Sequence, residues 1–113
     1  MDDHRTHFYN MNEIPFRQKR EMLDITGKTG KNLQMIIGRL DPGFASDHSH
    51  PQEQMGFILS GEIELTIGNE TRRCGAGYAY HIPANVHHSF RVVSDSPAEI
   101  LDIFSPPKDE NRI

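Results

Sequence analysis

The residues of this chain that could do metal chemistry are concentrated in the stretch GFASDHSHPQEQMGFILSG, residues 43–61. His48, His50 and Gln54 lie at even spacings within it. Successive side chains of a strand point to opposite faces, so an extended stretch would turn these three side chains the same way. Imidazole nitrogens and amide oxygens are suitable ligands for transition metals. The stretch therefore predicts one wall of a metal site.

A His-x-His pair alone is weak support for a metal site, because such pairs also occur on solvated loops. A second source of histidine follows in GYAYHIPANVHHSF, where His87 and His88 come after a Pro-x-Asn turn. Neighbours on a strand face opposite ways, so one of the two could join the first wall. The two stretches together predict a metal site built from two hairpins.

A carboxylate in the last apolar stretch, AEILDIFSPPKDE, is a candidate for proton transfer. Asp102 lies between Leu101 and Ile103 and has the same strand parity as Phe104. A charged residue within an apolar strand costs free energy unless it is paired, solvated or functional. Two interpretations are open: an edge strand with Asp102 in water, or a functional carboxylate.

Short strands separated by Gly, Pro and Asn turns must position these side chains. The expected strands are 33–40, 57–67, 70–73, 78–83, 89–93 and 98–104, and the expected turns are 27–30, 41–43, 68–69, 74–77 and 94–97. Residues 16–24 permit a weakly patterned helix, whereas residues 22–26 could form a first strand. Evenly spaced short strands are typical of an all-β barrel or jelly roll.

Length and composition limit the classes of function. The 113 residues predict one domain, and 12 basic against 16 acidic residues give a net charge of −4, without the basic footprint of a protein that binds nucleic acid or anionic membranes. The N-terminus lacks the apolar core of a signal peptide, and no apolar run approaches a membrane span. We therefore expect a cytoplasmic protein. A single cysteine, Cys74, excludes an internal disulfide and is expected to be a buried structural thiol.

The two histidine stretches resemble the paired motifs of the cupin superfamily. The first motif, G-x5-H-x-H-x3,4-E-x6-G, is matched at Gly43, His48, His50, Gln54 and Gly61, with Gln in place of Glu and one residue fewer before His48. The second motif, G-x5-P-x-G-x2-H-x3-N, corresponds to Gly77, Pro83, Asn85, His88 and Val92, with Val in place of the final Asn. Asn85 stands where the motif has Gly, and Asn tolerates a left-handed backbone better than most residues. The resemblance implies a single cupin domain over residues 1–113, a double-stranded β-helix with an N-terminal segment (1–30), a conserved barrel (31–104) and a C-terminal tail (105–113).

The signatures HSHPQEQ, GFILSGE and LDIFSPP are similar to those of small pectin-degradation cupins, which linearise 4,5-unsaturated monouronates. That resemblance implies four metal ligands, namely His48, His50, Gln54 and His88. It also implies that Asp102 is catalytic and that Phe104 and Lys108 bind the substrate, with Lys108 where that branch has Arg. The implied cofactor is a divalent transition metal, and its donor set suits Zn, Ni, Fe, Mn or Cu. The partners implied are a sugar-acid substrate and a second copy in a homodimer, to which the N-terminal segment could cross.

Two alternative functions stay open at this point. One is another metal-dependent cupin reaction, such as a dioxygenase or a sugar isomerase, and the other is a non-catalytic sugar-binding module. Three further polar residues are not expected to be metal ligands. His87 is interpreted as a structural or pocket-rim residue and His81 as a paired polar residue. Arg39 could reach either the pocket or a surface acid, and the surface acid is slightly favoured. Tyr78 and Tyr80 are expected to be packing residues of the barrel.

Overall fold

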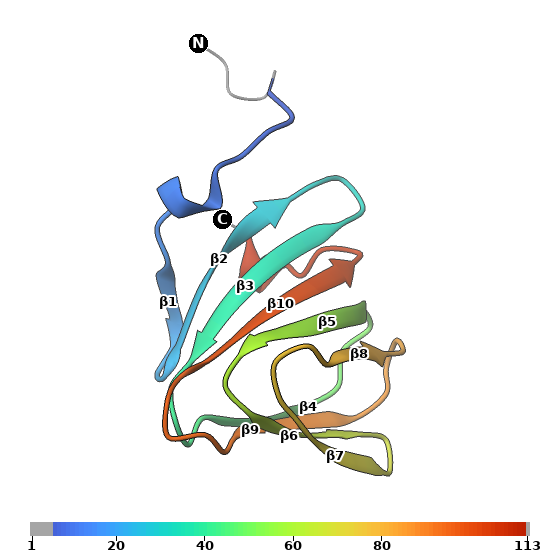
Figure 1. Ribbon diagram of the computed structural model, residues 1–113. Coiled ribbons are helices and arrows are strands. Elements are labelled where there is room, and N and C mark those ends of the chain that lie inside the picture. The colour runs from blue at the N-terminus through green and yellow to red at the C-terminus, as the bar shows by residue number, and fades with distance from the viewer. Residues whose placement is uncertain (1–5, 113) are drawn as a thin grey trace.

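Two antiparallel sheets face each other in the computed structural model, which describes residues 6–112 (Figure 1). The larger sheet has the strand order β1-β2-β3-β10-β5-β8, and its strands are Arg17–Arg20, Leu23–Thr29, Gln34–Leu40, Ala98–Ser105, Glu53–Ser60 and Ala79–Ile82. The smaller sheet has the order β4-β9-β6-β7, with strands Ala45–His48, His88–Val92, Ile63–Ile67 and Glu70–Cys74. Short 3-10 turns, η2 (Met11–Glu13) and η3 (Asp109–Asn111), lie near the two ends of the chain. The all-β barrel predicted from the sequence is confirmed.

The hydrophobic core lies between the sheets because the strands alternate between apolar inward and more polar outward residues. In β6, for example, Ile63 and Leu65 are buried, whereas Glu64 lies on the outer face. The main cluster is completed by residues of both sheets, including Ile58, Ile82, Phe90 and Ile100. The core fills the end of the barrel around β6 and β9 and leaves the opposite end free for polar side chains.

Strand β10 occupies the middle of the larger sheet, between β3 and β5. Asp102 pairs with Ile36 on one side and with Gly56 on the other, and only 7% of its surface is exposed. The edge-strand interpretation of Asp102 is therefore excluded. The predicted parity is confirmed, because Ile100, Asp102 and Phe104 all face inward.

The possible helix over residues 16–24 is wrong. Strands β1 and β2 form an antiparallel hairpin whose turn contains Met22 at a φ of 68°. The turn expected at residues 27–30 is also displaced, because β2 continues through Gly27 and pairs with β3 as far as Thr29. A Cβ on Gly27 would lie 2.1 Å from the Met35 carbonyl oxygen. This glycine therefore allows β2 and β3 to approach each other closely and does not form a turn.

The interpretation of residues 43–61 as one extended wall is also wrong. β4 ends at His48 in the smaller sheet, residues 49–52 form a loop, and β5 begins at Glu53 in the larger sheet. The expected run 57–67 is likewise divided between β5 and β6 by a turn at Gly61, which has a φ of +80°. The even spacing of His48, His50 and Gln54 therefore spans two sheets.

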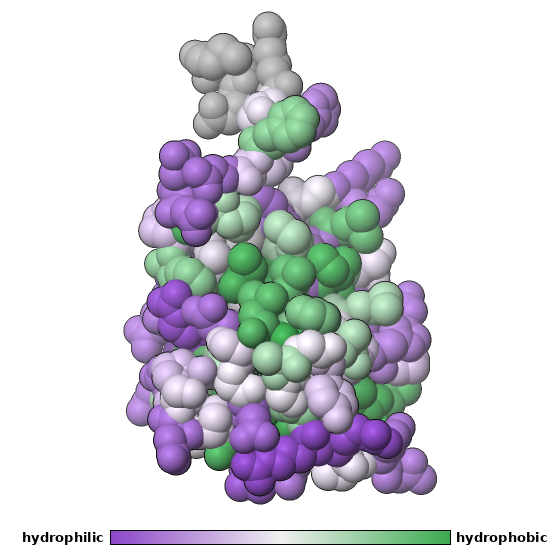
Figure 2. All heavy atoms as spheres, viewed as in Figure 1, coloured by the Kyte–Doolittle hydropathy of each residue, from purple (hydrophilic) through white to green (hydrophobic). Residues whose placement is uncertain are grey.

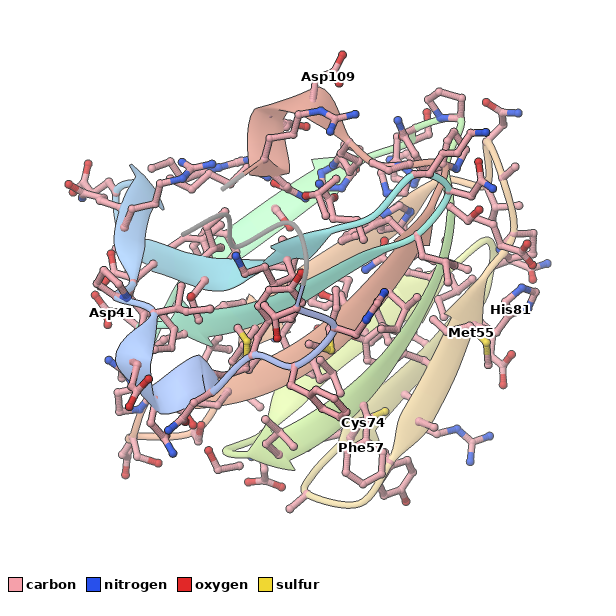
Figure 3. All side chains as sticks on the ribbon, turned by 90° about the horizontal axis from the view of Figure 1, so that it is seen from above. Asp41, Met55, Phe57, Cys74, His81 and Asp109 are labelled. Atoms are coloured by element: carbon pink, nitrogen blue, oxygen red, sulfur yellow. The ribbon has the colours of Figure 1, made fainter. Side chains whose placement is uncertain are left out.

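The outer face of the larger sheet carries hydrophobic side chains, which gather over the middle of the view in Figure 2. Met55, Phe57 and Leu59 point outward from β5 and are 56%, 41% and 43% exposed. Met55 and Phe57 lie on the outside of the barrel in Figure 3, where Met55 lies near His81 of the neighbouring strand. Among residues 6–112, no helix is long and apolar enough to cross a membrane.

Candidate metal and substrate site

Two histidines of the smaller sheet face the larger sheet at the open end of the barrel. His48 of β4 and His88 of β9 are cross-strand partners, and their ring centroids lie 4.6 Å apart. His88 is buried, with 1% of its surface exposed. The antiparallel pairing of β4 with β9 thus brings together residues that are forty positions apart in the sequence.

The third histidine, His50, lies in the loop between β4 and β5. The backbone N–H of Asn85 donates a hydrogen bond to the His50 carbonyl at 2.8 Å, which ties this loop to the loop before β9. Asn85 has a φ of 67°, the left-handed conformation expected where the cupin motif has Gly. The His50 ring centroid consequently lies 4.8 Å from that of His88 and 5.4 Å from that of His48.

Hydrogen bonds to backbone carbonyls fix the tautomers of two of these rings. Nδ1 of His50 donates to the Gln52 carbonyl at 3.0 Å, and Nδ1 of His88 donates to the Val86 carbonyl at 2.9 Å. In a neutral ring this leaves Nε2 as a bare lone pair. Nε2 of His88 is buried and has no hydrogen-bond partner within the part of the chain that the structure describes. A buried acceptor without a partner is what a bound cation would satisfy.

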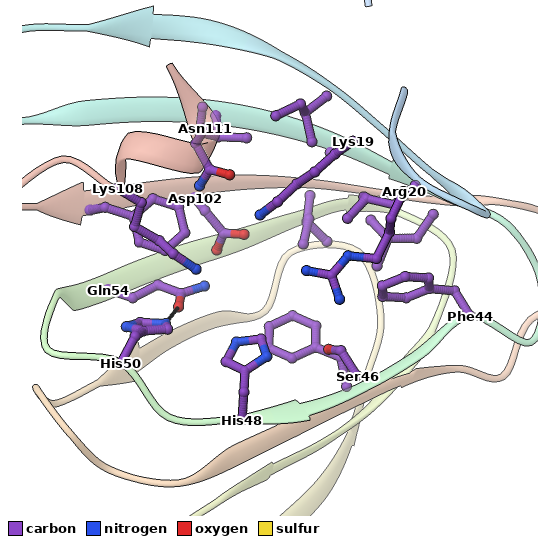
Figure 4. A pocket seen from close by; sticks show the side chains of 18 of the residues that line it. Lys19, Arg20, Phe44, Ser46, His48, His50, Gln54, Asp102, Lys108 and Asn111 are labelled. Atoms are coloured by element: carbon purple, nitrogen blue, oxygen red, sulfur yellow. Dashed lines mark hydrogen bonds between the residues drawn. The ribbon is translucent and has the colours of Figure 1, made fainter. Parts of the chain in front are cut away.

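Gln54 completes the donor set from the larger sheet (Figure 4). Its Oε1 lies 3.1 Å from Nε2 of His50, while its amide group hydrogen-bonds to the Asp102 carboxylate and so faces away from the ring. Because Nδ1 of His50 carries the proton and donates it to a carbonyl, Nε2 of His50 and Oε1 of Gln54 are both acceptors, although they lie only 3.1 Å apart. A cation held between them would turn their repulsion into attraction.

The residues present fit a divalent transition metal. The ring nitrogens of His48, His50 and His88 that could act as ligands lie within 4.8 Å of one another. Burial, followed by the neighbouring His88, lowers the pKa of His48 to about 4, and burial also lowers the pKa values of His50 and His88. All three rings are therefore neutral at pH 7, which is the protonation state that metal ligation requires.

The Asp102 carboxylate lies on the inner face of the larger sheet, in the same cavity as the histidines (Figure 4). Tyr80 donates a hydrogen bond from its hydroxyl to Oδ1 of Asp102 at 2.7 Å, so Tyr80 is more than the packing residue expected from the sequence. Burial raises the pKa of Asp102 to about 6, although the hydrogen bonds from Gln54 and Tyr80 oppose that rise. A carboxyl group with a pKa near neutrality can both take and return a proton.

Gly56 makes the contact between Tyr80 and Asp102 possible. A Cβ at this position would lie 2.1 Å from Cζ of Tyr80 and 2.4 Å from Oδ1 of Asp102. We expect Gly56→Ala to lower the free energy of unfolding by about 2–3 kcal/mol, as overpacking of a filled interior does. Urea denaturation measures this loss. Gly75→Ala is the control, because its Cβ would meet no atom closer than 3.8 Å, and an equal loss in both variants would contradict the close-approach role.

The C-terminal tail folds back over the cavity and brings Lys108 into it. Gln34, which is 1% exposed, donates from Nε2 to the Lys108 carbonyl and accepts from the Lys108 N–H, at 3.0 and 3.1 Å. Nζ of Lys108 lies 5.4 Å from the ring centroid of Phe104 and 3.1 Å from Oε1 of Glu110. The predicted site residues Asp102, Phe104 and Lys108 therefore all line the same cavity as the histidines.

Among the cavity residues that the sequence analysis missed, three polar ones come from outside the recognised motifs. Lys19 and Arg20 project from β1 and Asn111 from η3, and all three line the cavity (Figure 4). The cavity has a volume of about 80 Å³ and is open to solvent at its mouth. The KR dipeptide in a weakly patterned segment offered no signal, because its role depends on the pairing of β1 with β2.

Lys19 is held in an electrostatically unfavourable place. Burial, followed by the charge of Lys108, lowers the pKa of Lys19 to about 8, with Arg20 and Arg17 acting in the same direction and Glu110 opposing them. The folded protein therefore loses this proton at lower pH than the unfolded chain does. The charge on Lys19 destabilises the fold below pH 8, and that cost disappears as the pH rises from about 8 to 10.5.

Lys19→Met is consequently expected to raise the free energy of unfolding at pH 7 by about 1–3 kcal/mol. The gain over the unsubstituted protein should shrink between pH 8 and 10.5, where the lysine becomes neutral in both states. Denaturant titrations at several pH values measure it, with the exposed Lys31→Met as control. A variant less stable at pH 7 than the unsubstituted protein would contradict the sign of this effect.

Other polar candidates lie outside the cavity. His87 is exposed and pairs with Asp47, His81 is exposed and pairs with Glu53 at 2.6 Å, and Arg39 pairs with Glu99 at 2.9 Å. Their residue types resemble those of the site, but their side chains lie on the outer surface and pair with acids there. The single thiol, Cys74, is buried against the core, as expected.

The sequence profile of the cupin domain matches residues 37–104, from β3 to β10. This chain belongs to the cupin family. An uncharacterized protein of Streptomyces coelicolor is 33% identical to this cupin over 79 residues, which are 69% of this chain and 74% of the relative. The transcriptional regulator PuuR of Escherichia coli, named as HTH-type, is 32% identical over 82 residues, which are 71% of this chain and 44% of the regulator. This cupin therefore matches less than half the length of that relative.

The solved structure of KdgF from Halomonas sp. superimposes on this cupin with a TM-score of 0.86. The match covers 93% of this chain and 97% of that one, at 21% sequence identity. This likeness establishes a shared fold.

Proposed function

We propose that this cupin opens the ring of 4,5-unsaturated monouronates to 4-deoxy-5-keto uronates. The observation that carries this proposal is the buried Asp102 carboxylate in the same cavity as a three-histidine cluster. Gln54 is hydrogen-bonded to this carboxylate. A non-catalytic metal site would not require a desolvated acid at that place. The motif resemblance of HSHPQEQ and LDIFSPP to uronate-linearising cupins supports the same assignment.

His48, His50, His88 and the oxygen of Gln54 are the proposed ligands of a divalent metal. When bound, such a metal would keep its positive charge, because all four donors are neutral, and it would stabilise negative charge on the substrate oxygens. The backbone carbonyls of Gln52 and Val86 hold two of the rings in the tautomer that ligation needs.

Asp102 is the proposed acid–base residue. It accepts the proton of the anomeric hydroxyl as the bond between C1 and the ring oxygen breaks, and it returns a proton to C4 of the resulting enol. The aldehyde at C1 and the ketone at C5 are thus formed without gain or loss of electrons. Tyr80 holds the carboxylate in place through its hydroxyl, and Phe104 provides an apolar wall for the sugar.

Proton NMR of fresh 4,5-unsaturated galacturonate tests the proposed reaction. We expect the C4 vinyl signal to disappear faster with metal-loaded protein than in a protein-free blank, and a chelator to remove the difference. A rate equal to that of the blank would contradict ring opening. Oxygen uptake by the same mixture would instead identify a dioxygenase, because ring opening consumes no oxygen.

A non-catalytic sugar-binding module is the second candidate function. The relative PuuR, which aligns over 82 residues, is named as a transcriptional regulator and not as an enzyme, and this favours a role without turnover. Such a module would bind uronate without turnover, so the NMR measurement separates the two candidates.

The expected homodimer stays a prediction. The outward-facing Met55, Phe57 and Leu59 of β5 provide an apolar surface that a second copy could cover. The molecular mass of the protein in solution measures its oligomeric state.

A further inference from the structure

Strand β1 contains an irregularity that changes which of its side chains enter the cavity. Gln18 pairs with Asp24 and Arg20 pairs with Leu23, so Lys19 is an extra residue in the strand. A β-bulge of this kind redirects side chains and is common beside active sites. Lys19 and Arg20 are sequence neighbours that a regular strand would turn to opposite faces, yet both line the cavity (Figure 4).

The cations of the cavity differ in how far their charges are already paired. Lys108 lies 3.1 Å from Oε1 of Glu110, and Lys19 lies 3.7 Å from Oε2 of the same carboxylate. One acid is thus shared by two lysines. The Arg20 side chain has no hydrogen bond or ion pair with any residue between positions 6 and 112, and its guanidinium points into the cavity in Figure 4.

The shared Glu110 leaves a positive excess at the end of the cavity that β1 covers. Burial is the largest cause of the lowered pKa of Lys19, and the charges of Lys108 and Arg20 lower it further, against the opposing charge of Glu110. An anionic ligand would relieve that repulsion. Only a planar guanidinium can bind a carboxylate with two parallel hydrogen bonds, and Lys108 cannot do so.

We infer that Arg20, with Lys19 beside it, is the carboxylate-recognition subsite of this cupin and selects sugar acids over neutral sugars. This inference rests on the proposed function for the identity of the substrate. It assigns the two-pronged contact to the bulged strand β1, outside the residues matched by the cupin profile, and leaves Lys108 as part of the ion pair with Glu110.

Arg20→Gln and Arg20→Lys test the subsite in the full-length, zinc-loaded protein. Calorimetric titration with galacturonate and with galactose gives the preference for the acid without any turnover. We expect Arg20→Gln to reduce that preference by about 10- to 100-fold, the range for losing a hydrogen bond to a charged group. Arg20→Lys should keep part of the preference for the acid. The exposed control Arg91→Gln should leave that preference unchanged.

Kinetics on unsaturated galacturonate separates this inference from the proposed function. If the protein turns over the uronate, Arg20→Gln should raise KM at least about 10-fold and leave kcat within about 3-fold, as expected for lost uniform binding. If there is no turnover but galacturonate binding still depends on Arg20, the proposed reaction fails and the subsite stands. An unchanged preference and an unchanged KM in Arg20→Gln would overturn the subsite, as would equal affinity of the unsubstituted protein for galacturonate and galactose.

Discussion

Asp102→Asn is expected to lower kcat for uronate ring opening by about 100- to 10,000-fold, the usual contribution of a general acid–base residue. Asparagine keeps a side-chain oxygen for the hydrogen bond from Tyr80, but it cannot take a proton from the anomeric hydroxyl. The metal content should stay normal, because Asp102 is not one of the proposed ligands. The vinyl NMR signal gives the rate, and elemental analysis gives the metal content.

Tyr80→Phe is the matched control for this experiment. It removes the hydroxyl that donates to Oδ1 of Asp102 but leaves the carboxylate in the cavity. We expect a fall in rate that is much smaller than for Asp102→Asn, together with a changed pH profile, since one hydrogen bond that lowers the pKa of Asp102 is lost. Turnover of Asp102→Asn at the unsubstituted rate would remove Asp102 from the mechanism.

His88→Ala is expected to lower metal affinity by more than about 100-fold and to leave no measurable ring opening. Removal of a group that only hydrogen-bonds to a metal ligand costs up to about 100-fold, and removal of a ligand should cost more. The reason is that Nε2 of His88 is buried without a hydrogen-bond partner among the described residues, and the His88 ring lies close to both of the other histidine rings. Competition with a chromogenic chelator measures the affinity. His88→Gln keeps much of the side-chain volume and supplies an amide oxygen, so it should bind metal better than His88→Ala.

The adjacent His87 provides the control. Its ring is exposed and pairs with Asp47, so His87→Ala should change neither metal affinity nor rate. Thermal unfolding of both alanine variants shows whether any loss of metal follows from loss of the fold. A folded His88→Ala variant that keeps normal metal affinity would contradict the proposed ligand set.

The sequence by itself determined the fold class and singled out seven of the residues that line the cavity. Alternation in β10 predicted that Asp102 and Phe104 share one face, because strand parity depends only on local backbone geometry, and the structure shows that this face is the inner one. The substitution of Asn for Gly at position 85 was correctly judged mild, since asparagine adopts the left-handed φ found there. Motif spacing likewise selected the histidine of the pair at 87–88 that enters the cavity.

The tertiary structure decided what local patterns cannot encode. His48 and Gln54 belong to different sheets, so their convergence arises from the closure of the barrel and not from their even spacing. Asp102 is buried because β10 lies between β3 and β5, and strand order depends on contacts far apart in the sequence. Lys19 and Arg20 enter the cavity because one extra residue in β1 breaks strand alternation, and a bulge is defined only by the partner strand against which it is counted.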